Sequence, residues 1–133
     1  MRLSSLKEIA ERLLPELVEK YHLKDWDIVL KYHRFDDSAD FFAFVDINEP
    51  YKTAVIVWNT GKARYIKDEN DVLEILEHEL QHIALHPFEA LRSIVLSTVD
   101  KKVHKIIDSE FDRTSERLRK IIGNLTGRGN RVI

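Results

Sequence analysis

The sequence predicts an α+β domain that consists of an N-terminal helix, a small and mainly antiparallel three-stranded sheet, and two or three further helices. Apolar side chains recur at helical spacing over residues 5–20. Three short runs rich in β-forming residues follow, at 26–32, 41–47 and 53–58. From Asn70 onward the apolar period changes from two to about 3.6 residues, which is typical of helices.

The N-terminal helix is predicted from a start signal and an apolar stripe. Ser5 and Glu8 stand at the spacing of a capping box, in which each side chain bonds the backbone of the other residue. Pro15 lies inside the helix and is expected to bend it. The predicted buried stripe contains Leu6, Ile9, Leu13, Leu14 and Leu17.

The second and third strands are predicted to form a hairpin. Residues 48–52, Asn-Glu-Pro-Tyr-Lys, form a turn-like connection of suitable length between strands 41–47 and 53–58. Either of these strands could bind an extended peptide by adding it to the sheet, if that strand lies at an edge.

The helical half of the chain begins near Asp68 or Asn70, either of which is a suitable N-cap. The apolar stripe of this first helix contains Val72, Leu76, Leu80 and Ile83. Pro87 should end or kink the helix, because proline lacks the backbone donor that a helix interior needs. Another helical piece is predicted from Phe88 to about Leu96, and a long helix over 103–122.

The predicted domain organisation is one domain over residues 1–123, followed by a mobile tail over residues 124–133. A chain of 133 residues is long enough to bury one core. Gly123 is a plausible C-terminal cap for the last helix. The residues after it are rich in Asn, Thr and Gly and offer little to bury.

Composition excludes several functions. The chain contains no cysteine, so His, Asp and Glu are the only strong ligands for a transition metal. With a net charge of -2, it has no large positive field to hold nucleic acid. No apolar run is long enough for a membrane span, and the N-terminus resembles no secretion signal. We therefore expect a cytoplasmic protein that binds neither nucleic acid nor membrane.

One motif carries specific chemistry: His78-Glu79-Leu80-Gln81-His82. Residues four apart lie on the same helix face, about 6 Å apart along the axis, so both imidazoles can reach one ion. The intervening glutamate, Glu79, lies beside the ion, where it can take a proton from water. On a continuous helix His86 would lie about 12 Å of rise beyond His78, too far to share that ion.

Catalytic zinc (Zn2+) typically takes three protein ligands, so the motif needs a third. The acids at 108–116 are the best candidates in the sequence. On a regular helix, Glu110 falls within the predicted apolar stripe, where an acid needs a partner, whereas Asp112 falls outside it. The predicted stripe contains Val103, Ile106, Ile107, Phe111, Thr114, Leu118 and Ile121.

The motif and the downstream acidic helix resemble those of the gluzincin metallopeptidases, in which a glutamate on a later helix completes the zinc site. In the thermolysin-type pattern, Glu-x-x-Ser-Asp, the ligand position corresponds to Asp112 and the last position to Glu116. The family register thus favours Asp112 and the helical wheel favours Glu110. We predict Glu110 as the third ligand, with Asp112 as the alternative.

The order of elements resembles that of the minigluzincins, which are small zincin-like domains. The resemblance implies a zinc-dependent peptidase that hydrolyses peptide bonds of a peptide or protein substrate through a metal-activated water, with Glu79 as general base. It also implies that a terminal segment such as 124–133 could keep the enzyme latent. Tyr65 would either donate to the oxyanion or anchor its loop. The alternative function is an inactive zinc-binding interaction or regulatory protein on the same fold.

Overall fold

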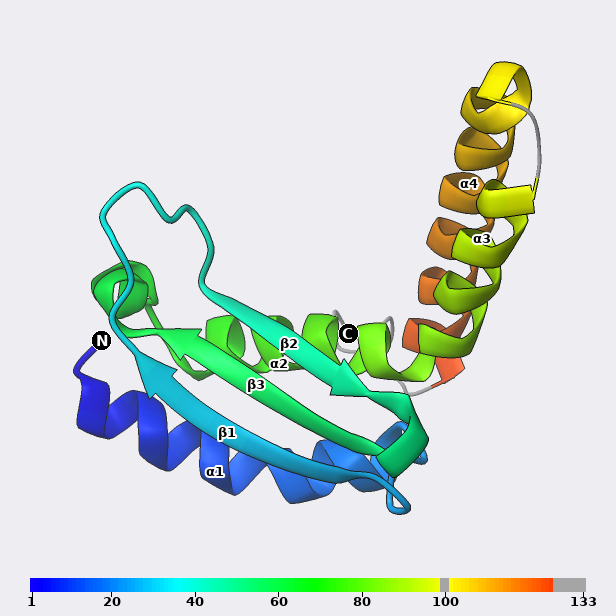
Figure 1. The fold of residues 1–133 in the computed structure, drawn as a ribbon. Coiled ribbons are helices and arrows are strands. Elements are labelled where there is room, and N and C mark those ends of the chain that lie inside the picture. Colours follow the sequence, from blue (N-terminus) through cyan, green and yellow to red (C-terminus); the bar gives the residue numbers. More distant parts are fainter. Residues whose placement is uncertain (99–100, 126–133) are drawn as a thin grey trace. The chain divides into compact units, whose positions relative to one another are not determined.

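The computed structural model describes the backbone of residues 1–98 and 101–125, and side chains outside 99–102 and 124–133. It is an α+β structure with a three-stranded mixed sheet (Figure 1). The chain divides into two compact units, Met1–Ile83 and Ala84 onward. The described elements are α1 (Leu3–Lys20), β1 (Asp27–His33), β2 (Ala43–Asn48), η1 (Glu49–Tyr51), β3 (Thr53–Asn59), η2 (Thr60–Tyr65), α2 (Glu69–Ala84), α3 (His86–Thr98) and α4 (Lys101–Leu125).

Helix α1 begins earlier than its sequence signal indicates. Arg2, not Ser5, occupies the N-cap position, and no side chain caps the helix there. The predicted capping box is therefore wrong, and Ser5 lies within the first turn. Pro15 remains inside the helix, as predicted. The residues that α1 buries are Leu6, Ala10, Leu13 and Leu17.

The strand order is β1-β3-β2, with β1 parallel and β2 antiparallel to β3. The expected hairpin is present, because Asn48 pairs with Thr53 and Ala43 with Trp58. The sheet is nevertheless mixed, not mainly antiparallel. After β1 the chain reverses direction and forms β2, leaving room for one strand between them. It then reverses again, and β3 fills that central place and runs parallel to β1. Segment 53–58 is thus the central strand, and only β2 remains of the two candidate edges.

The first unit buries its core on one side of the sheet. Figure 1 shows α1 and α2 on the same face, and the inward side chains of the central strand are almost fully buried. The opposite face carries the more exposed positions of the edge strands, including Val29 and Phe44. The buried side chains of β3 on the helix side are Ala54, Ile56 and Trp58, each no more than 1% exposed.

Helix α2 has a well-defined N-terminus. The Asp68 carboxylate accepts a hydrogen bond from the Asp71 N–H at 3.0 Å, and the Asp71 carboxylate accepts one from the Lys67 N–H at 2.8 Å. This reciprocal arrangement satisfies donors that a helix start would otherwise leave unpaired. Of the two predicted N-cap residues, Asp68 is confirmed and Asn70 lies inside the helix. The helix carrying the histidine motif is thus fixed at its start.

The second unit contains α3 and α4. The Phe88 and Phe111 ring centroids lie 5.0 Å apart, and the Arg92 guanidinium donates to Asp108 and Asp112, each at 2.7 Å. Helix α4 continues through Gly123 to Leu125, so Gly123 does not end it. The remainder of the predicted tail, 126–133, lies outside the described residues.

Candidate metal centre

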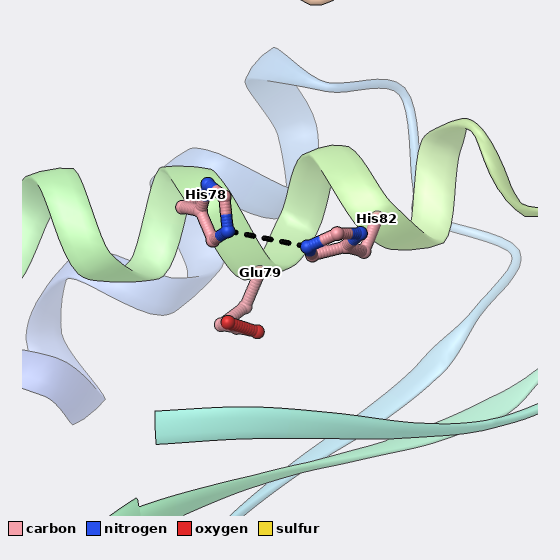
Figure 2. Close-up of side chains that lie close together, drawn as sticks. All are labelled: His78, Glu79 and His82. Atoms are coloured by element: carbon pink, nitrogen blue, oxygen red, sulfur yellow. Dashed lines mark hydrogen bonds between the residues drawn. The ribbon is translucent and has the colours of Figure 1, made fainter. Parts of the chain in front are cut away.

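His78 and His82 face each other on successive turns of α2 (Figure 2). Their Nε2 atoms lie 3.2 Å apart, and their ring planes stand at 89°. At this separation one imidazole donates to the other when one of the two Nε2 atoms carries a proton. When neither Nε2 atom carries a proton, both rings could instead bind one metal ion through these atoms.

This separation fits zinc. With Zn–N bonds of about 2.0–2.1 Å and tetrahedral angles, two ligand nitrogens lie about 3.3 Å apart. Potential ligand atoms of His78, Glu79 and His82 all lie within 4.8 Å of one another. Within the described part of the chain, this is the one group of three or more His and acidic side chains close enough to hold a metal ion. The predicted pair is therefore brought together, although the group does not specify which metal binds.

Glu79 points from α2 toward the sheet (Figure 2). Its side chain is buried, with the residue only 6% exposed. Loss of hydration disfavours the charged form and raises the pKa of Glu79 from 4.5 to about 7. A carboxyl group with a pKa near neutrality can both accept and return a proton at physiological pH, which suits a general base.

A buried hydrogen-bond network lies next to the histidine pair. Tyr21, directly after α1, donates its hydroxyl proton to the Glu77 carboxylate at 2.6 Å, and the Gln81 amide donates to that hydroxyl at 3.4 Å. Glu77 is fully buried and Gln81 is 3% exposed. The network ties α2 to the end of α1 and so opposes rotation of the metal-facing side. This network was not predicted from the sequence, although Glu77 and Gln81, two polar residues four apart on one helix face, are a visible signal.

The candidate third ligands lie on α4, in the second unit. Contrary to the predicted stripe, Glu110 is exposed and forms an ion pair with Arg113 at 3.1 Å. Asp112 is also exposed and is paired with Arg92. The helical-wheel argument for Glu110 thus fails, because its side chain already has a cationic partner in solvent. Either residue's role as a zinc ligand stays a prediction.

His86 is not on the helix that the sequence argument assumed. Helix α2 ends at Ala84, and His86 is the first residue of α3. The exclusion of His86 by helix rise therefore loses its basis. Pro87 follows at a position where the missing backbone donor costs little, which agrees with its predicted role as a helix boundary.

Two adjoining cavities lie in the first unit, and residues of α2 line only the smaller one. One has a volume of about 210 Å³ and is lined by Phe42, Tyr65, Ile66, Asp71, Glu74 and Ile75. The other has a volume of about 350 Å³ and is lined by Asp40, Phe41, Phe42, Lys62 and Tyr65. Tyr65 is 53% exposed and contributes to both. Tyr65 was a predicted site residue, whereas the other wall residues were not predicted, because they come from separate elements.

Comparison with family models, with curated proteins and with solved structures finds no match for this chain. Among the described helices, none combines the length and the apolar character that crossing a membrane requires.

Proposed function

We propose that this chain is a zinc-dependent metallopeptidase that hydrolyses peptide bonds of a peptide or protein substrate. The observation that carries the proposal is the 3.2 Å separation of the His78 and His82 Nε2 atoms, which matches two ligands of one tetrahedral ion. The buried carboxylate of Glu79 beside this pair adds the acid–base group that hydrolysis needs. The zincin-like relationship and a cytoplasmic location belong to the same proposal.

Each site residue has a distinct role. His78 and His82 hold the metal through Nε2, and Glu110 completes the site, with Asp112 as the alternative. Zinc, when bound, supplies a Lewis acid for the scissile carbonyl and lowers the pKa of water. Glu79 takes the proton of the attacking water and returns it to the leaving amine. Burial of Glu79 keeps this proton exchange away from bulk solvent.

Two features support a peptide as substrate. Strand β2 is an edge of the sheet and can pair with an extended chain through its free backbone groups. The two cavities of the first unit have aromatic and polar walls that can receive side chains of such a chain. Both features belong to the same unit as the histidine pair.

The test is Glu79→Gln, with Glu16→Gln on the exposed face of α1 as the matched control. Zinc content is measured by elemental analysis, and cleavage of a mixed peptide pool by mass spectrometry. We expect Glu79→Gln to retain zinc and to lose cleavage by roughly a hundredfold or more, since general acid–base catalysis contributes about 10²–10⁴-fold. Equal cleavage by Glu79→Gln and by the unaltered chain would refute the assignment of the base.

The ion pairs of Glu110 and Asp112 favour a second candidate, a zinc-binding interaction or regulatory protein without turnover. The same assay separates the two candidates. It is run on the full chain and on a chain ending at Leu125, because residues 126–133 could act as a latency segment. If both forms bind zinc and neither cleaves any peptide, the peptidase proposal fails and the interaction protein remains.

A further inference from the structure

The smaller cavity has the dimensions of a site for one long side chain. Its volume of about 210 Å³ is below the range of about 300–1,000 Å³ that holds whole small-molecule ligands. Phe42 and Tyr65 also line the larger neighbouring cavity. Two cavities with a shared wall suit neighbouring residues of one extended chain better than one compact ligand.

The walls of the smaller cavity are held in place by the core. Asn59 is only 2% exposed, and its amide donates to the Phe41 carbonyl at 3.1 Å. The Asn59 side-chain oxygen accepts a hydrogen bond from the Gly61 N–H at 3.1 Å. These bonds connect the segment before β2 with η2, which carry Phe42 and Tyr65. The cavity is therefore largely preformed, which reduces the entropy that binding must overcome.

The chemistry of the lining selects a cation on an apolar stem. Phe42, Ile66 and Ile75 supply apolar wall, whereas Asp71 and Glu74 supply two carboxylates. No lysine, arginine or histidine lines this cavity. The Asp71 carboxylate accepts the Lys67 N–H and the Glu74 carboxylate accepts the Asn70 amide, but neither acid forms an ion pair with a described residue. In the larger cavity the Lys62 ammonium lies 3.8 Å from Asp40, so charge there is already balanced. Arginine and lysine combine an apolar stem with a charged head that carboxylates bind.

The cavity lies along α2 from the histidine pair. Glu74 precedes His78 by one helical turn, or about 6 Å of rise, and Asp71 precedes it by about 10 Å. An extended peptide advances about 3.3 Å per residue. A substrate side chain in the cavity would thus belong to a residue about two or three positions from the cleaved peptide bond, which would lie at the metal.

We propose that the cavity formed by Phe42, Tyr65, Ile75, Asp71 and Glu74 binds an arginine or lysine side chain of the substrate. The substrates are then basic peptides with a cationic residue about two or three positions from the cleaved bond. This inference rests on the proposed peptidase function for the meaning of that position, but binding in the cavity does not depend on turnover.

The test is binding of acetylated hexapeptides by the full-length, zinc-loaded chain, in a Glu79→Gln background that keeps the peptides intact. Each peptide carries one arginine in an otherwise alanine sequence, and a matched peptide carries citrulline, which has the same shape without the charge. Calorimetry gives the dissociation constants for three proteins. They are Glu79→Gln alone, Glu79→Gln with Glu74→Gln, and Glu79→Gln with Glu16→Gln. Of the two glutamates substituted in addition to Glu79, Glu74 lines the cavity and Glu16 does not.

We expect arginine peptides to bind about tenfold more tightly than citrulline peptides, which corresponds to about 1.4 kcal/mol. Glu74→Gln should reduce this ratio to about threefold or less, because a charge-assisted bond becomes a neutral one, and Glu16→Gln should leave it unchanged. Equal binding of the two peptides, absence of binding, or a ratio insensitive to Glu74→Gln would each overturn the proposal. Failure of the peptidase function appears separately, as absence of cleavage by the unaltered chain.

Discussion

Helix α2 and the α3–α4 pair present polar side chains in opposite ways. The residues that α2 buries include Glu77, Glu79 and Gln81, whereas α3 buries none. The exposed acids of α4 have arginine partners, such as Arg92 and Arg113. Buried polar groups of α2 are therefore held by the surrounding packing and by the Tyr21 hydrogen bonds, and the exposed acids of α4 by ion pairs. The proposed catalytic base, Glu79, lies on α2, where packing limits its hydration. An acid in an exposed ion pair stays hydrated.

The largest expected effect of this difference is on stability. Leu80 is fully buried next to Glu79, whereas Ile94 on α3 is 61% exposed. Leu80→Ala should lower the free energy of unfolding by about 2–5 kcal/mol, because it leaves a cavity in the core. Ile94→Ala should change it by less than about 0.5 kcal/mol. Urea unfolding followed by circular dichroism measures both, and similar losses would contradict the contrast.

Metal affinity is the next test. His82→Ala removes one of two facing nitrogens, and we expect zinc affinity to fall by roughly a hundredfold or more, since even outer partners of metal ligands contribute about 10–100-fold. His33→Ala is the control, because His33 is an exposed residue at the end of β1 and lies outside the metal-holding group. Competition with a chelating dye gives the affinities. Unchanged zinc binding by His82→Ala would exclude the proposed site.

The buried position of Glu79 predicts a pH dependence in the zinc-free protein. Its pKa is about 7 when folded and 4.5 ordinarily, so between these values the folded chain holds more protons than the unfolded chain. This contribution to stability is present at low pH and is lost as the pH rises through 7. Between pH 5 and 8 the free energy of unfolding of the unaltered protein should therefore fall by about 2 kcal/mol more than that of Glu79→Gln. Parallel stability curves for the two proteins would contradict a buried, titrating carboxyl.

The smallest expected effect distinguishes the two acids of α4. Glu110→Gln and Asp112→Asn each keep the shape of the side chain and remove its charge. The substitution at the true ligand should weaken zinc binding by about tenfold, because an amide oxygen remains as a poorer ligand, and the other should change it by less than about twofold. The chelator competition used for His82→Ala measures both. If neither substitution weakens binding, the third ligand lies elsewhere.

Local patterns predicted much of α2 from the sequence. Its N-cap, its apolar stripe and the shared face of His78 and His82 all follow from helix geometry, which neighbouring residues determine. The raised pKa of Glu79 and the cavity walls did not follow in the same way. They depend on which strands and loops cover α2, and those segments are distant in sequence.

The face of α4 shows the limit of a helical wheel. The wheel assigned Ile106 and Thr114 to the buried stripe, yet Ile106 is 65% exposed and Ser115 is 6% exposed. A wheel locates apolar residues but not the neighbouring helix. The Phe88–Phe111 contact involves a residue of the predicted stripe, whereas the Arg92–Asp108 pair brings a residue outside that stripe into contact with α3.

The mixed sheet has a consequence for the order of folding. The β2–β3 hairpin closes through a short turn. In contrast, β1 pairs with β3 across the longer segment 34–52, which includes β2, as in the pairing of Asp27 with Thr53. Closing the longer loop costs more chain entropy, so the local pair is expected to form first. Strand β1 then completes the sheet as its last member, although the ribosome makes it first.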